Sequence, residues 1–179
     1  MSNWRLINSV SIKKTRYAQL YEDEVIDSNG QRKKYTYLHN RPFVVIVACR
    51  NGKFILVKQY RYVLAKSLIE FPSGGIEEGE IPIDAAKREL EHETGYTSDS
   101  WEELGHIVES VGTVKSEGTV YLVEDAKNTG NKNWNEEYIE KILSYTSSDL
   151  EHLISSGQII DSTTIAAYFL AKNHLTQKI

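Results

Sequence analysis

The chain has 179 residues, and its composition, 40% hydrophobic and 26% charged, is that of an ordinary globular protein with one buried core. A formal net charge of −4 argues against nucleic-acid binding, which needs a basic face. The single cysteine, Cys49, excludes an intrachain disulfide and favours a reducing compartment. No apolar run is long enough to span a membrane, and the N-terminus lacks the apolar region of a signal peptide. We therefore expect a cytoplasmic protein without nucleic-acid or membrane partners.

The N-terminal region is predicted to form a β-hairpin. Residues 4–26 alternate partly between apolar and polar types, Asp-Ser-Asn-Gly at 27–30 is a strong turn signal, and residues 34–38 resume as a strand. An isolated hairpin is marginally stable, so it must pack against its own domain or against a partner subunit. We assign residues 1–41 to this β region and residues 42–179 to the main domain.

The main domain is predicted to be an α/β/α sandwich, because its strands alternate with one central and two C-terminal helices. The polar stretch 124–136 is predicted to be a long loop. The other elements are a strand at 43–49, a turn at 50–53, a strand at 54–60, a loop at 62–67, strands at 101–110, 119–123 and 138–145, a helix from an N-cap at 147–149 to 155, and a helix capped by Asp161.

The segment 70–96 passes from a strand through a Pro/Gly loop into a charged helix. Residues 71–75, Phe-Pro-Ser-Gly-Gly, are not expected to continue a strand ladder, because proline lacks an N–H donor and glycine is conformationally loose. Pro82 suits the first turn of the helix, and Gly95 suits the left-handed residue just beyond its end.

Two glutamates of this helix are predicted to be neighbours. Glu89 and Glu93 are i and i+4, about 40° apart on the helical wheel, so their carboxylates repel each other unless a cation lies between them. Mg²⁺ suits such a pair, because it binds a few carboxylates together with water and phosphate oxygens. His92 lies at the outer edge of this acidic arc. The alternative is an ordinary solvated charged face.

This segment resembles the Nudix box, whose pattern is G, five residues, E, seven residues, and then R-E-apolar-x-E-E-x-G-apolar. The fixed positions correspond to Gly74, Glu80, Arg88-Glu89-Leu90, His92-Glu93 and Gly95-Tyr96. His92 is the one departure, since the pattern has Glu there. The resemblance implies a Nudix-type sandwich with a mixed sheet.

The flanking sequences look like the ADP-ribose pyrophosphatase branch of that family. The similar segments are 57–61 (VKQYR), 70–74 (EFPSG) and 157–164 (GQIIDSTT). The resemblance implies hydrolysis of a nucleoside diphosphate linked to another group, with ADP-ribose giving AMP and ribose 5-phosphate. It also implies Mg²⁺ or Mn²⁺ as cofactor and a homodimer that shares the N-terminal hairpin.

Residue by residue, the resemblance assigns Glu89 and Glu93 as metal ligands and catalytic residues. Ser73 matches the position whose backbone carbonyl completes the coordination, and His92 replaces a further ligand. Arg88 is placed to orient a carboxylate or to brace the loop, with a plain surface salt bridge as the alternative. His92 is equally open to interpretation as a surface histidine.

On the substrate side, Arg61 matches a phosphate-binding position, because its fork of donors suits phosphate oxygens. Glu70 is grouped with it as a substrate-binding residue. Arg41 and Tyr35, with Tyr37, are candidates for binding phosphate and stacking on a purine across a dimer. An exposed strand-end arginine and half-buried strand tyrosines are the ordinary alternatives.

The general base is expected in the long loop, where Glu136 and Glu137 are the candidates and Glu137 is preferred. A second departure is Val111, where many enzymes of this branch carry proline in a substrate-side loop. Two alternatives to ADP-ribose hydrolysis therefore stay open. The first is a nucleotide-binding or regulatory module without catalysis, and the second is hydrolysis of another nucleotide sugar or of a dinucleotide.

Overall fold

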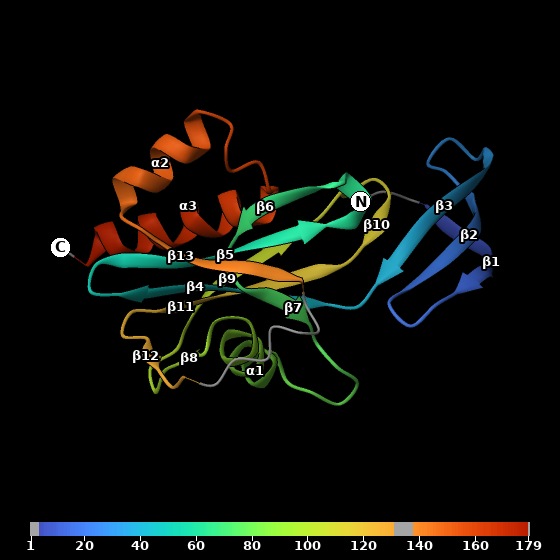
Figure 1. The fold of residues 1–179 in the computed structure, drawn as a ribbon. Helices are drawn as coiled ribbons and strands as arrows, with labels where there is room; N and C mark the ends of the chain where they lie inside the picture. Colours follow the sequence, from blue (N-terminus) through green and yellow to red (C-terminus); the bar gives the residue numbers. More distant parts are fainter. Residues whose placement is uncertain (1–3, 131–137, 179) are drawn as a thin grey trace. The chain divides into compact units, whose positions relative to one another are not determined.

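The computed structural model describes residues 4–130 and 138–178, which form two compact units (Figure 1). One unit contains the chain up to residue 42 together with residues 108–117, and the other contains residues 43–107 and 118–179. Within the described ranges, no helix is sufficiently long and apolar to cross a membrane.

The first unit is a four-stranded sheet in the order β1-β2-β3-β10. Its strands are β1 (Arg5–Lys14), β2 (Ala18–Ile26), β3 (Arg32–Asn40) and β10 (Val114–Lys115). The turn predicted at 27–30 is confirmed: the Asp27 carboxylate accepts the backbone N–H groups of Asn29 and Gln31, and Gly30 has a φ of +78°. The pairing of β10 with β3 is parallel, whereas the hairpins β1-β2 and β2-β3 are antiparallel.

The second unit is built on a mixed sheet in the order β13-β5-β4-β11-β9. β11 runs parallel to β4, and β5 runs antiparallel to both β4 and β13. Two short strands join it, because β6 pairs with β5 and β7 pairs with β4. The bounds are β4 (Phe43–Arg50), β5 (Lys53–Arg61), β6 (Lys66–Glu70), β7 (Ser73–Gly75), β9 (Glu102–Val108), β11 (Glu117–Val123) and β13 (Ile139–Tyr145).

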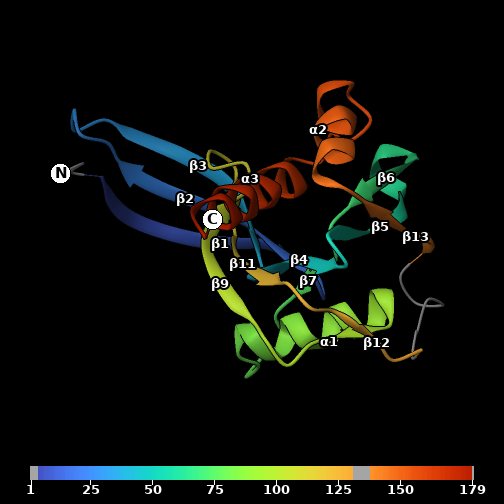
Figure 2. The ribbon, with the colours of Figure 1, turned by 90° about the vertical axis from the view of Figure 1, so that its left-hand side faces the viewer.

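Helices cover both faces of this sheet, which confirms the predicted α/β/α sandwich (Figure 2). They are α1 (Pro82–Thr94) on one face, and α2 (Ser147–Ser155) and α3 (Ser162–Gln177) on the other. Successive residues of a strand point to opposite faces. Val44 and Ile46 therefore pack with Leu90 of α1, whereas Val45 and Val47 pack with Ala167 of α3.

The helix ends follow the predicted capping signals, with one shift. Pro82 occupies the first turn of α1, and Gly95 ends it with a φ of +69°. The Asp161 side chain caps α3 by accepting the N–H of Thr164. The N-cap of α2 is Thr146, one residue before the predicted Ser147–Asp149, because Thr146 and Asp149 form a reciprocal capping box.

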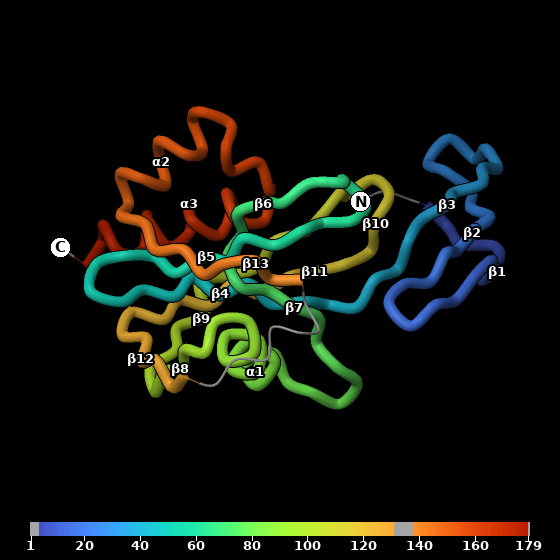
Figure 3. Tube along the Cα trace, viewed as in Figure 1, coloured from blue at the N-terminus to red at the C-terminus, as the bar shows by residue number. Residues whose placement is uncertain are grey.

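One prediction about the segment 71–75 is wrong. Residues Ser73–Gly75 do continue in the sheet, as β7, but on β4 instead of β5 (Figure 3). Pro72 cannot donate, so the β5-β6 ladder ends at Glu70. The Pro72 carbonyl accepts the N–H of Ile46 at 2.8 Å, which brings the chain onto the neighbouring strand.

The connections contain short regular elements. A 3₁₀ turn at Tyr62–Leu64 precedes β6, so the predicted loop at 62–67 is shorter than expected. In the polar stretch after β11, β12 (Lys127–Asn128) pairs with β8 (Tyr96–Thr97). Residues 131–137 of that stretch lie outside the described residues.

Candidate active site

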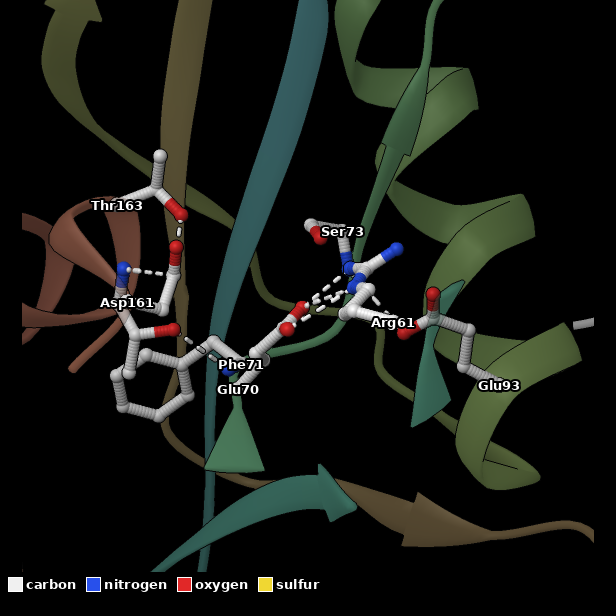
Figure 4. A network of polar contacts seen from close by, with 8 residues as sticks. Arg61, Glu70, Phe71, Ser73, Glu93, Asp161 and Thr163 are labelled. Atoms are coloured by element: carbon white, nitrogen blue, oxygen red, sulfur yellow. Dashed lines mark hydrogen bonds and ion pairs between the residues drawn. The ribbon is translucent and has the colours of Figure 1, made fainter. Parts of the chain in front are cut away.

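Arg61 and Glu70 form an ion pair where β5 and β6 lie side by side (Figure 4). The Arg61 Nε donates to both oxygens of the Glu70 carboxylate, at 2.9 and 3.1 Å, and Nη2 donates to one of them. Glu70 is 4% exposed, so its charge needs this compensation. The hydrogen bond to Glu70 raises the pKa of Arg61, and the nearby Glu93 raises it further.

The second carboxylate beside Arg61 is that of Glu93, on α1. Figure 4 shows Arg61 lying between Glu70 and Glu93. Glu93 is 3% exposed, and its Oε2 accepts the backbone N–H of Ser73 at 3.2 Å. Because Ser73 pairs with Val45 in the β4-β7 ladder, the sheet fixes the direction of this N–H. Ser73 therefore holds Glu93 through its amide, a contact that the sequence did not indicate.

Glu89 lies one turn before Glu93 and is also buried, at 5% exposure. Its Oε1 accepts a hydrogen bond from Arg88 Nη1 at 2.5 Å. The carboxylate lies directly against Gly74 of β7, where a Cβ would be 2.0 Å from Oε1. The glycine at position 74 is therefore a requirement of close approach, since any side chain there would occupy the carboxylate's place.

Arg88 joins the helix to the loop that precedes it. Its Nε and Nη2 donate to the two carboxylate oxygens of Glu80, each at 2.9 Å, and Nη2 also donates to the Gly75 carbonyl at 3.0 Å. The Glu80 hydrogen bonds raise the pKa of Arg88 and lower that of Glu80. One guanidinium thus braces the loop and contacts the Glu89 carboxylate.

The structure brings together six of the residues singled out from the sequence. The six, all in the second unit, are Arg61, Glu70, Ser73, Arg88, Glu89 and Glu93. His92 is exposed on α1. Arg41 and Tyr35 belong to the first unit, where the Tyr35 hydroxyl donates to the Gly112 carbonyl at 2.5 Å. Glu137 lies outside the described residues.

The buried carboxylate pair fits a hard divalent cation. Glu89 and Glu93 supply anionic oxygens one helical turn apart, and water and phosphate oxygens complete the coordination of such a cation. Among residues 4–130 and 138–178, no three His, Cys, Asp or Glu side chains are arranged to hold a metal by themselves.

Sequence reasoning also missed a second contact of this region, which is buried. The Phe71 N–H donates to Thr164 Oγ1 at 3.1 Å, across 93 positions of the chain. The sequence singled out the segment 157–164 only as a similarity to the ADP-ribose pyrophosphatase branch. No local signal connects it to the turn between β6 and β7.

Comparison with known proteins identifies the family. A family model described as a NUDIX domain matches residues 39–162, which is more than half of the chain. The chain belongs to the Nudix family. The box found in the sequence, residues 74–96, lies within the matched range.

Two relatives match this Nudix chain over most of their length. The ADP-ribose pyrophosphatase of Bacillus subtilis is 31% identical over 150 residues, covering 83% of this chain and 81% of the relative. A methanol dehydrogenase activator of Bacillus methanolicus is 31% identical over 177 residues, covering 91% and 89%. A crystal structure of an ADP compounds hydrolase matches with a TM-score of 0.86 at 20% identity, over 98% of this chain and 95% of that one. The structural match supports the fold alone.

The contact between Gly74 and Glu89 predicts two effects of Gly74→Ala. The added methyl group would lie 2.0 Å from Oε1 and 2.7 Å from Cγ of Glu89, so this buried side chain would have to move away from Arg88, and the free energy of unfolding should fall by about 1–3 kcal/mol. Affinity for Mn²⁺, measured by titration with electron paramagnetic resonance, should fall by roughly tenfold or more.

The matched control is Gly75→Ala, because a Cβ on Gly75 meets no atom within 4 Å. This variant should bind Mn²⁺ like the unmodified protein. Equal affinities for the two variants would contradict the assignment of Glu89 as a ligand.

Proposed function

We propose that this Nudix enzyme catalyses the metal-dependent hydrolysis of a nucleoside diphosphate linked to another group, with ADP-ribose as substrate and AMP and ribose 5-phosphate as products. The observation that carries the proposal is the pair of buried carboxylates, Glu89 and Glu93, one helical turn apart, with Glu93 beside the Arg61 guanidinium. The similarity to the ADP-ribose pyrophosphatase of Bacillus subtilis supports the choice of substrate.

Phosphoryl transfer needs charge neutralisation and in-line positioning more than covalent help. A divalent cation held by Glu89 and Glu93 would polarise a phosphoryl oxygen and lower the pKa of the attacking water. Arg61 binds Glu70 through Nε and Nη2, so Glu70 fixes the guanidinium plane and Nη1 is left to donate to a diphosphate oxygen. Arg88 holds the Glu89 carboxylate against Gly74, so this ligand is oriented before substrate binds.

Other residues complete the proposal from the family resemblance. Glu137 is the proposed general base, Arg41 and Tyr35 are proposed to bind the nucleotide, and the Ser73 carbonyl is a proposed metal ligand. Val111, which is 81% exposed, replaces the proline that many enzymes of this branch have. Nucleotide sugars and dinucleotides therefore belong in the substrate panel beside ADP-ribose. The cytoplasm is the proposed location, consistent with the single cysteine.

The first test is AMP release from ADP-ribose with Mg²⁺, with Mn²⁺ and without metal, for the unmodified protein and for Glu93→Gln. Glu93→Gln removes an anionic ligand while keeping the shape of the side chain. Turnover should fall by more than the roughly 10–100-fold that outer-shell changes cause, at an unchanged urea midpoint.

Glu91→Gln provides the control, because it removes the same charge from α1 outside the buried pair. Its turnover should match that of the unmodified protein. Undiminished turnover by Glu93→Gln would refute the proposed site, whereas release of product from another diphosphate alone would change only the substrate.

His92 is proposed to shift the metal preference from Mg²⁺ toward Mn²⁺, because it stands where the family pattern has an anionic ligand and imidazole suits Mn²⁺ better. His92→Glu should raise the Mg²⁺-supported kcat/KM several-fold, because it restores the anionic ligand of the family pattern. A several-fold change corresponds to less than about 1.4 kcal/mol, the free energy of a factor of ten. His152→Glu adds the same charge to α2 and should have no effect. An unchanged ratio of Mg²⁺ to Mn²⁺ activity in His92→Glu would identify His92 as a surface histidine.

A homodimer is proposed from exposed apolar side chains on the edge strand β1. Leu6, Val10 and Ile12 are each at least half exposed, and exposed apolar surface of this kind marks association sites. Light scattering after size exclusion should give a mass near twice 20.4 kDa. Val10→Glu should lower that mass to one chain, and a monomeric unmodified protein would argue against a shared hairpin.

A further inference from the structure

The turn between β6 and β7 is tied to a different element at each of its residues. Glu70 binds Arg61 of β5, and Pro72 accepts the N–H of Ile46 in β4. Phe71 donates its N–H to Thr164 of α3, and Ser73 donates its N–H to Glu93 of α1. We call residues 70–73 the crossing segment. It connects both faces of the sheet within four residues.

The hydrogen bond from the Phe71 N–H to Thr164 of α3 is buried at both of its ends. Thr164 is 2% exposed and Phe71 is 1% exposed, so neither group has water as an alternative partner. A buried N–H left without an acceptor costs about 1–3 kcal/mol. The Phe71 N–H follows the last residue of the β5-β6 ladder, and Thr164 Oγ1 is the acceptor that satisfies it.

The first turn of α3 fixes the position of the Thr164 hydroxyl. The Asp161 carboxylate accepts the Thr164 N–H at 2.7 Å and the Thr163 hydroxyl at 2.5 Å (Figure 4). An N-cap of this kind holds the first turn in helical geometry. The last residue of the segment 157–164, Thr164, thus holds its hydroxyl oxygen in a fixed position as an acceptor for the crossing segment.

A displacement of the Phe71 backbone would also displace its neighbours Glu70 and Ser73. The peptide units are planar and Pro72 has a fixed φ, so few soft dihedrals separate the Phe71 amide from Ser73. On one side, Glu70 orients Arg61; on the other, the Ser73 amide orients Glu93. The hydrogen bond from the Phe71 N–H to Thr164 lies between these two contacts in the sequence.

We propose that Thr164 is a positioning residue of the site, acting through the crossing segment on Glu93 and Arg61. Its effect on turnover rests on the proposed function, whereas its effects on the amides of the segment and on metal affinity do not. A merely structural hydroxyl would protect the Phe71 amide, which donates to it, without changing the Ser73 amide or the metal affinity. The distinction can therefore be measured.

The decisive experiment compares Thr164→Val, which keeps the shape and removes the acceptor, with Thr164→Ser, which keeps the hydroxyl. Tyr168→Phe is the matched control, because it removes from the same helix a hydroxyl that contacts Ser147 and Glu151 instead. The readouts are hydrogen exchange of the Phe71 and Ser73 amides by NMR, Mn²⁺ affinity by electron paramagnetic resonance, and kcat and KM for ADP-ribose.

Thr164→Val should accelerate exchange of both amides and weaken Mn²⁺ binding by about tenfold, the lower end of typical outer-shell effects. Thr164→Ser should restore both toward the unmodified values, and Tyr168→Phe should leave both unchanged. Asp161→Ala, which loosens the same turn, should change both in the same direction by less, and it takes the place of Thr164→Val should that variant not fold.

The proposal is overturned if Thr164→Val and Tyr168→Phe have the same Mn²⁺ affinity, or if serine fails to restore it. An unmodified protein that binds Mn²⁺ but releases no AMP would refute the proposed function and leave this comparison intact. An unmodified protein that binds no Mn²⁺ would also refute the proposed function. The positioning role would then be overturned by equal exchange of the Ser73 amide in Thr164→Val and Tyr168→Phe.

Discussion

The burial of two like charges one helical turn apart is the constraint on which the rest of this site depends. Carboxylates removed from water are costly unless hydrogen bonds or opposite charges compensate them. Glu89 obtains its compensation from Arg88, and Glu93 obtains its from the Ser73 amide and the nearby Arg61. The helix alone cannot provide this environment, so the strands must.

The central strand β4 provides that environment from the other side. It pairs with β11 and β5, and near its beginning it also receives β7. This last pairing puts Gly74 against Glu89 and directs the Ser73 amide toward Glu93. Backbone N–H groups need acceptors, and the β4-β7 ladder directs the Ser73 N–H to the buried Glu93 carboxylate. The same ladder places Gly74, which has no side chain, against the Glu89 carboxylate.

Local rules predicted the parts of the site that depend on short spacing. Pro82 and Gly95 fixed the ends of α1, the i, i+4 relation made Glu89 and Glu93 neighbours, and Asp161 capped α3. Each of these signals acts over at most four residues. The fold class also followed from the sequence, because the alternation of strands and helices admits few ways to bury both faces of a sheet.

Contacts between distant segments could not be predicted in this way. The return of residues 73–75 to the sheet depends on β4, which lies 28 positions earlier at Val45. The partner of Phe71 lies on α3, and residues 108–117 join the N-terminal strands. The wheel placed His92 near the acidic arc, but only the packing of α1 decides that this side chain is exposed while its neighbour Glu93 is buried.

The crossing segment also determines where the chain tolerates a change in length. Only Phe71 and Pro72 separate β6 from β7, and a shift of one residue in a strand exchanges its two faces. Deleting or inserting a single residue there would disrupt three contacts together: the Ser73 amide with Glu93, Gly74 against Glu89, and the Phe71 N–H with Thr164. The described contacts of the Asp27 carboxylate in the β2-β3 turn lie within the hairpin itself, so length variation among related chains should accumulate there and be absent between residues 70 and 75.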